Sequence, residues 1–232
     1  EALRARRNIK EVYISSGRHE KLFLIKKETE SRGIALRIVD VAFFNERFPK
    51  GHQGIAVKVS EKGYMDLYEL LNIPEKRNEI PFFLILDCIE DPGNVGAILR
   101  SADAAGVHGV IVQEHRSAGL SPAVSKASAG AVEYVPVSQV SNIKHAISEM
   151  KEREITIIGA ESGSGNMPWD VDFSVPAGLV IGSEGRGLRK TVAEKCDFVV
   201  SIPMRGRVNS LNVSAASAVL MFEVLRQRVR KN

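Results

Sequence analysis

Two apolar runs in the C-terminal part of the chain, each followed by a glycine-bearing polar turn, decide how the fold is read. They are LVIGSEGRGL at residues 179–188 and FVVSIPMRGRVNSLNV at residues 198–213. Branched apolar runs bounded by Gly and Pro are typical of buried parallel strands. Ligands of open α/β sheets bind at the carboxyl ends of such strands. The sequence therefore predicts that Gly182–Gly187 and Ile202–Asn212 form two neighbouring walls of one pocket.

Upstream of these runs, strand and helix patterns alternate. We expect strands at 81–89, 109–113, 133–137 and 155–160, and helices at 121–129 and 143–153. A further helix begins after Asp91, which can cap it, and ends at Gly106. The run 179–213 adds two strands and a helix at 188–195, and a last helix spans about 212–229. This alternation predicts an α/β domain built on a parallel sheet.

The 232 residues are expected to form two domains. Residues 1–60 read as a small α/β module, residues 61–80 as a polar linker, and residues 81–232 as the larger domain. The first 60 residues carry 13 Lys or Arg and 7 Asp or Glu, a net charge of +6, whereas the whole chain has +4. A basic module attached to a near-neutral one suggests that the basic module binds a polyanion. The alternative is that its basic residues form a solvated surface without a ligand. The opening Glu1 suggests that the natural N-terminus is missing.

Composition narrows the class of protein. The two cysteines, Cys88 and Cys196, read as free thiols in a reducing compartment. Cysteine and histidine spacing predicts no metal site. The sequence shows neither a signal peptide nor an apolar run of membrane-spanning length, so no membrane partner is expected. We expect a cytoplasmic protein, and an organelle matrix is equally compatible.

The segment DPGNVGAILR at residues 91–100 is the first candidate for chemistry. Glycines after a strand allow close approach of a ligand, but the spacing does not fit the GxGxxG dinucleotide fingerprint. Asn94 lies in the first helical turn. Arg100 lies on a helix otherwise lined by apolar residues, where either phosphate recognition or a structural salt bridge would explain it.

Other polar residues stand in loops. Glu184 is the acid of the GSEGRG turn, which lacks the GK[ST] of a phosphate-binding P-loop. Ser210 or Asn212 can cap the last helix, and Arg205 and Arg207 suit either phosphate contacts or a solvated surface. In the N-terminal module the segment KGHQG at 50–54 presents polar groups that could contact RNA or simply shape a loop. Candidate RNA-binding residues are therefore His52, Gln53, Arg205 and Arg207.

Taken together and in order, the segments LDCIEDPGNVGAILRSADAAG, IGSEGRGL and IPMRGRVNSLNVSAA resemble the three motifs of the SpoU-type RNA ribose 2′-O-methyltransferases of the SPOUT superfamily. The resemblance covers residues 82–228. It implies a deep trefoil knot in the C-terminal domain, S-adenosylmethionine as cofactor, RNA as substrate, and a homodimer with a shared active site. The N-terminal module, with its HQGIA segment, resembles the ribosomal-protein-like domain of the branch that methylates a guanosine ribose in 23S ribosomal RNA.

The resemblance also implies roles for single residues. The family's polar active-site positions fall on Asn94, Arg100, Glu184, Ser210 and Asn212. Its cofactor contacts, largely through the backbone, fall on Gly182, Gly187, Ile202, Met204 and Leu211. The expected reaction is in-line attack of a ribose 2′-oxygen on the sulfonium methyl group. We expect Arg100 to stabilise the developing alkoxide and to hold a phosphate, because an arginine pKa above ~12 makes it a poor base.

Three other functions remain open at this point. A tRNA could be the substrate, or the chain could be a non-catalytic RNA-binding or ribosome-assembly protein. A nucleotide-dependent oxidoreductase is disfavoured, because GxGxxG does not follow the first strand of the larger domain.

Overall fold

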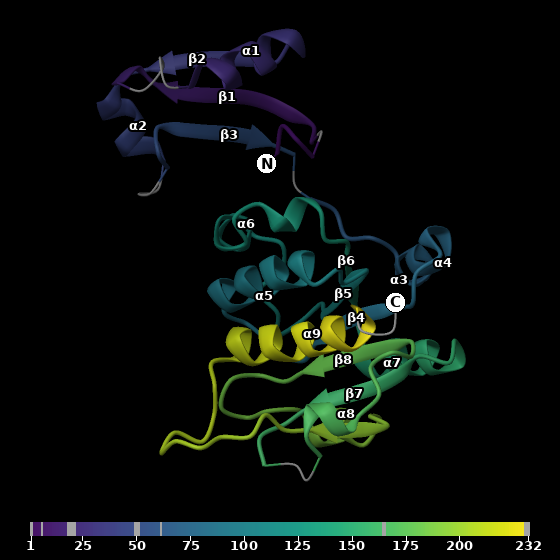
Figure 1. The fold of residues 1–232 in the computed structure, drawn as a ribbon. Coiled ribbons are helices and arrows are strands. Elements are labelled where there is room, and N and C mark those ends of the chain that lie inside the picture. The colour runs from purple at the N-terminus through teal and green to yellow at the C-terminus, as the bar shows by residue number, and fades with distance from the viewer. Residues whose placement is uncertain are drawn as a thin grey trace. The chain divides into compact units, whose positions relative to one another are not determined.

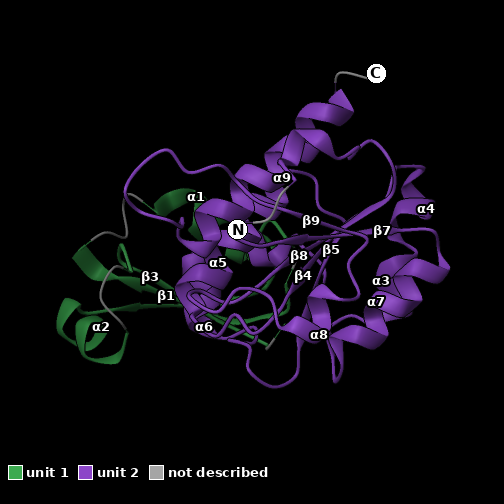
Figure 2. Ribbon diagram, turned by 90° about the horizontal axis from the view of Figure 1, so that it is seen from below, with its two compact units in different colours: residues 1–62 green, residues 63–232 purple. Residues whose placement is uncertain are grey.

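The computed structural model describes residues 2–5, 7–17, 22–48, 52–60, 62–163 and 166–229. Glu1, on which the expectation of a missing N-terminus depends, lies outside them. The chain divides into two compact units, residues 1–62 and residues 63–232, coloured separately in Figure 2. Each unit has its own hydrophobic core.

Unit 1 is a three-stranded sheet with two helices. Its elements are β1 (Ile9–Ser15), α1 (Phe23–Ser31), β2 (Ala35–Val39), α2 (Val41–Arg47) and β3 (Ile55–Val59). The central strand β1 pairs in parallel with β2 and antiparallel with β3. Val12 and Ile14 of β1 are fully or almost fully buried, and apolar residues such as Ile25 of α1 pack against them. The expected small α/β module is therefore present.

Residues 61–80 were expected to be a linker, but residues 63–80 are part of unit 2 and contribute Leu70 and Leu71 to its core. They form α3 (Leu67–Leu71) and α4 (Ile73–Arg77). Asp66 caps α3 by accepting from the backbone N–H of Tyr68, and Pro74 lies in the first turn of α4, where a missing N–H is harmless. Leu70 is completely buried, and a Cβ on Gly109 would approach its side chain to 2.6 Å. Because the segment is mostly polar, its sequence did not indicate that Leu70 packs against the sheet of unit 2.

Unit 2 is built on a six-stranded parallel sheet with the order β6-β5-β4-β8-β7-β9. Its strands are β4 (Phe82–Leu86), β5 (Gly109–Gln113), β6 (Val137–Val140), β7 (Thr156–Ala160), β8 (Ala177–Ile181) and β9 (Phe198–Val200). The strand expected at 133–137 is wrong in its position: residues 131–133 form the 3-10 turn η2, and β6 begins where that expected strand ends. The expected parallel sheet is confirmed.

Helices cover both faces of this sheet, as Figures 1 and 2 show. On one face lie α5 (Pro92–Ala104), α6 (Pro122–Ala127) and α9 (Val213–Val229). On the other lie α3, α4, α7 (Ile143–Glu152) and α8 (Lys190–Ala193). Every residue of β4 is buried, with Leu84 facing the first layer and Phe83 the second. This explains why the β4 sequence shows no polar alternation. The trefoil knot that the resemblance implies stays a prediction.

Candidate active site

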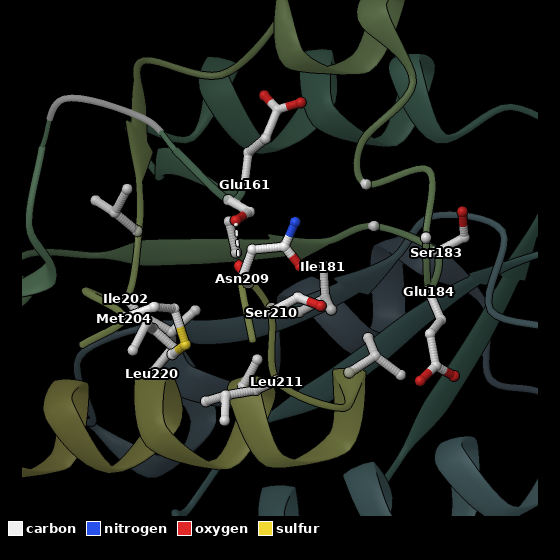
Figure 3. A pocket seen from close by; sticks show the side chains of 18 residues that line it. Glu161, Ile181, Ser183, Glu184, Ile202, Met204, Asn209, Ser210, Leu211 and Leu220 are labelled. Atoms are coloured by element: carbon white, nitrogen blue, oxygen red, sulfur yellow. Dashed lines mark hydrogen bonds between the residues drawn. The ribbon is translucent and has the colours of Figure 1, made fainter. Parts of the chain in front are cut away.

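A cavity of about 330 Å³ lies at the carboxyl ends of three neighbouring strands, β8, β7 and β9. We call it the first cavity. Its lining comes from the end of β7 (residues 160–162), the end of β8 and the turn after it (residues 181–185 and 187), β9 and the loop after it (residues 200, 202, 204 and 209–211), and α9 (residues 213, 216 and 220). Figure 3 shows Ile202, Met204, Leu211 and Leu220 gathered on one side of it, with Ser183 and Glu184 on another. The two segments expected to be neighbouring pocket walls do meet here.

The turn after β8 is held in a tight closed loop. Ser183 and Gly187 exchange two backbone hydrogen bonds, N–H of Ser183 to O of Gly187 at 3.0 Å and the reverse at 2.9 Å. Gly187 has φ +65°, a conformation that favours glycine. A Cβ on Gly182 would lie 2.2 Å from the carbonyl carbon of Gly187, so the two backbone segments are in direct contact. The glycines are therefore needed to close the loop.

Three of the predicted polar residues meet, although they come from three separate segments. Asn94 Nδ2 donates to Glu184 Oε2 at 3.2 Å. Asn212 Nδ2 donates to Asn94 Oδ1 at 3.0 Å and lies 3.5 Å from Glu184 Oε1. We call these three side chains the polar triad. It ties the start of α5 to the glycine loop and to the start of α9.

The same residues also shape the ends of helices. Asp91 caps α5 by accepting from the N–H of Asn94 at 2.7 Å. Asn212 Oδ1 accepts from the N–H of Ser214 at 2.9 Å and from its hydroxyl at 2.6 Å, so the Asn212 amide caps α9 and donates to the triad at once. Ser210 is exposed and lines the first cavity beside them.

A second cavity, of about 740 Å³, adjoins the first. It lies at the ends of β4 and β8 and is also lined by Arg116 of the loop after β5. Ser183, Glu184, Gly187 and Val213 line both cavities, so the glycine loop is their shared wall.

An ion pair between a buried carboxylate and a half-buried arginine lies beside this second cavity. Asp87 is fully buried at the end of β4 and accepts from Arg189 Nε at 2.7 Å and from the Arg189 backbone N–H at 3.0 Å. Arg189 also donates to Gln113 Oε1 at 2.8 Å. Burial, together with the adjacent Asp87 carboxylate, raises the pKa of the Cys88 thiol. This cavity-lining cysteine is therefore protonated at neutral pH and is a poor nucleophile.

Arg100, the predicted catalytic arginine, lies apart from the triad. It is exposed on α5, lines neither cavity, and has no hydrogen bond or ion pair within the described part of the chain. Arg205 and Arg207 are exposed on the loop that follows β9, outside both linings. In contrast, all five residues expected to contact the cofactor (Gly182, Gly187, Ile202, Met204 and Leu211) line the first cavity.

In unit 1, His52 is engaged within its own loop. Its Nδ1 accepts from the N–H of Gly54 at 3.1 Å, and its Nε2 lies 3.2 Å from Asn45 Oδ1. Its ring packs against Phe44 at a centroid distance of 4.5 Å. Gln53 is exposed and has φ +50°. Lys50 and Gly51 of the same predicted segment lie outside the described residues. These contacts give His52 a structural role in the loop, and RNA contact stays a prediction for both residues.

Sequence reasoning missed several lining residues of the first cavity. Glu161 and Ser162 follow β7, and Ser162 Oγ donates to the carbonyl of Asn209 at 3.0 Å, which links the turn after β7 to the loop after β9. The rule that ligands bind at strand ends would have pointed to Glu161 and Ser162, had the order of strands been known. Within the described ranges, no helix is long and apolar enough to cross a membrane, and no cluster of three or more His, Cys, Asp or Glu residues could hold a metal ion.

Comparison with known proteins identifies the class. The model of the SpoU rRNA methylase family matches residues 81–222, and a model described as RNA 2′-O ribose methyltransferase substrate binding matches residues 1–65. The chain is 43% identical over 199 residues to the putative TrmH family tRNA/rRNA methyltransferase YacO of Bacillus subtilis, covering 86% of this chain and 80% of that protein.

Solved structures of methyltransferases superpose on most of this chain. The SpoU methyltransferase AviRb from Streptomyces viridochromogenes superposes with a TM-score of 0.80 and 26% identity, covering 100% of this chain and 86% of that one. Its complex with S-adenosylmethionine gives 0.77 and 25%, covering 98% and 86%. An S-adenosylmethionine-bound rRNA methyltransferase from Sinorhizobium meliloti gives 0.79 and 25%, covering 97% and 82%. The chain belongs to the SpoU rRNA methylase family and is an RNA methyltransferase that uses S-adenosylmethionine.

The first cavity fits this cofactor. Its volume of about 330 Å³ lies within the range of small-molecule sites, and its apolar side chains (Ile202, Met204, Leu211, Val213 and Leu220) suit a purine ring. Gly182 and the ends of β7, β8 and β9 bring the backbone close to the same space.

Proposed function

We propose that the chain methylates a ribose 2′-hydroxyl of RNA, and that the substrate is a guanosine of large-subunit (23S) ribosomal RNA. The observation that carries this proposal is the polar triad Asn94–Glu184–Asn212, in which Glu184 lines both cavities and Asn94 lines the second. Glu184 therefore stands between a pocket suited to the cofactor and a pocket open to a second reactant. The matching substrate-binding model over residues 1–65 supports an RNA ribose as that reactant.

The bound cofactor supplies an electrophilic methyl group on a sulfonium with a good leaving group. The chain's own residues then have to align the 2′-oxygen and assist loss of its proton. Ser210 lines the first cavity beside Leu211, on the segment that ends at the triad residue Asn212. We assign Ser210 and the triad to orienting the ribose. Ser210 lines the first cavity, and hydrogen bonds fix the polar groups of the triad before the substrate arrives.

Arg100 fits this scheme through a second protomer. In one chain it lies on the exposed side of α5, and α5 packs against α9. Four exposed apolar residues, Ala215, Val219, Phe222 and Val229, follow one stripe along α9. We propose that these faces of α5 and α9 meet their copies in a homodimer, so that Arg100 serves the partner's site. There it would hold a phosphate and stabilise the developing alkoxide.

Tritiated methyl transfer from S-adenosylmethionine tests the proposal. Separate reactions offer naked 23S-type ribosomal RNA and tRNA transcripts, and labelled products are mapped to single nucleotides. Label at one ribose of a ribosomal guanosine is the expected result. Label in tRNA alone would keep the chemistry and replace the substrate, and label on a base would overturn the 2′-O assignment. Cofactor binding without transfer to naked RNA would direct the same assay to ribosome assembly intermediates.

A further inference from the structure

The second cavity contains two arginines with no function in the scheme above. Arg116 follows β5 and Arg186 lies in the glycine loop, and both are exposed while lining the same cavity. Neither forms a hydrogen bond or an ion pair within the described part of the chain. The third lining arginine, Arg189, is already held by Asp87 and Gln113. Two unpaired guanidinium groups therefore reach one polar cavity from two separate loops.

The acidic groups of this cavity are largely engaged elsewhere. Asp91 caps α5, and the Glu184 carboxylate accepts from the triad amides. Glu90 is exposed and is the remaining lining carboxylate. Arg116 also has φ +59°, which is uncommon for a residue with a side chain. Neither Arg116 nor Arg186 has a hydrogen-bond or ion-pair partner among the described residues, so an anionic partner from outside can reach them.

The position of the cavity identifies that partner. The second cavity shares Ser183, Glu184, Gly187 and Val213 with the first, so a reactant that approaches the cofactor from this side passes through it. Every RNA nucleotide brings a phosphate on either side of its ribose. Arginine is suited to phosphate because its planar fork donates two parallel hydrogen bonds.

We propose that the second cavity receives the target nucleotide, and that Arg116 and Arg186 bind the phosphates flanking its ribose. This inference rests on the proposed function and deepens it. It adds two RNA-binding residues of unit 2 to those expected from the sequence. Asn94, which lines the second cavity, and Glu184, which lies on the shared wall, would then face the ribose.

The test compares Arg116→Gln, Arg186→Gln and the double variant with Arg77→Gln, a matched control that is exposed on α4 outside both cavities. The readouts are the RNA dissociation constant across a salt series, KM for RNA, kcat, and the dissociation constant of S-adenosylmethionine. Each single variant should weaken RNA binding roughly tenfold, the loss expected for one charged hydrogen-bonding contact. Each should also lower the slope of log K against log salt by about 0.7, the value for one phosphate contact to a single strand.

The affinity for S-adenosylmethionine should stay at the wild-type value in all variants. Arg116→Lys and Arg186→Lys should keep most of the wild-type salt slope, because the ammonium group still binds phosphate as a point charge. An unchanged slope and KM in the double variant would overturn the inference. So would a loss of cofactor affinity that parallels the loss of RNA affinity, which would show that the arginines only shape the loop. The salt dependence of RNA binding is measured without methyl transfer. It therefore tests the role of Arg116 and Arg186 even if the wild type methylates none of the RNAs offered.

Discussion

The side-chain amide of Asn212 donates to Asn94 Oδ1 at 3.0 Å while its own oxygen caps α9. One side chain thus makes both a helix cap and a contact of the polar triad, and two substitutions separate the two contacts. Asn212→Asp keeps an oxygen for the cap but loses the donor and sets a carboxylate near Glu184. We expect thermal stability close to wild type and methyl transfer lowered by about a hundredfold. Asn212→Ala should lose activity and also about 1 kcal/mol of stability. Equal stability losses in both variants would contradict this separation.

Arg100 and Glu184 should complement each other across a dimer. Arg100→Ala and Glu184→Gln variants are each expected to be inactive while still binding S-adenosylmethionine. If Arg100 serves the partner's site, each mixed dimer holds one intact site. An equimolar mixture should then recover about a quarter of wild-type activity after subunit exchange, as random pairing of a symmetric dimer requires. An inactive mixture in which mass spectrometry shows mixed dimers would place Arg100 in its own protomer's site.

Gly182 should tolerate no side chain. The Cβ of Gly182→Ala would lie 2.2 to 2.4 Å from backbone atoms of Gly187 and Leu188, so the glycine loop must shift. We expect a stability loss of about 1–3 kcal/mol and weaker S-adenosylmethionine binding by calorimetry. Gly63→Ala is the matched control, since no atom lies within 4 Å of the added carbon. A Gly182→Ala protein that binds the cofactor normally would show that the loop adapts.

Stability should depend on pH through His108. This side chain is buried, accepts from the N–H of Phe82 through Nδ1 and lies 2.8 Å from Glu79 through Nε2. Burial lowers its pKa, partly opposed by Glu79. The unfolded chain, with a histidine pKa of about 6.5, then binds the proton more readily than the folded chain. Stability should therefore fall as the pH drops below that value.

Urea unfolding at pH 7.5 and pH 5.5 measures this effect. The wild type should lose more stability between the two pH values than His108→Gln does. His145→Gln, a substitution at an exposed histidine of α7, should retain the wild-type pH dependence. An equal pH dependence in the wild type and His108→Gln would assign the effect to other groups.

Arg228 should be a major stabilising residue of unit 2. From the end of α9 it donates to the carbonyl oxygens of Phe173, Ile80, Pro81 and Val175 at 2.8 to 3.0 Å. Burial lowers its pKa to about 10, so it stays charged at neutral pH. Arg228→Met leaves these carbonyls unpaired and should cost about 2–3 kcal/mol in urea unfolding. Arg226→Met, which removes only the exposed pair with Glu223, should change stability by less than about 1 kcal/mol.

Local patterns were sufficient to predict most of unit 2. The apolar run of β4, the cap at Asp91 and the glycine turn after β8 each have a nearby physical cause, and each was found where the sequence indicated. Residues 63–80 were misread because the apolar pair Leu70–Leu71 is short and its partners are distant in sequence. The Asp87–Arg189 pair joins residues 102 positions apart, and no local pattern reports such a contact.

The candidate site likewise combines residues that a local sequence pattern indicates with residues that no local pattern indicates. The five positions that the family resemblance implies for the cofactor line one cavity, and their contact with the cofactor stays a prediction. Glu161 and Arg116 could not be predicted, since their place in a cavity wall depends on which strands are neighbours. Arg100 was expected either to recognise a phosphate or to form a structural salt bridge. A single chain leaves it outside both cavities, and its catalytic role stays a prediction.

The glycine loop that separates the two cavities has a consequence for the order of events. Ligands on opposite sides of one closed loop are coupled, because a shift of the loop that one ligand induces changes the binding site of the other. If S-adenosylmethionine tightens the loop, RNA affinity rises by some factor, and RNA must raise the affinity for the cofactor by that same factor. If the demethylated cofactor and the methylated RNA face the same wall after transfer, the departure of either one changes the affinity for the other by one common factor.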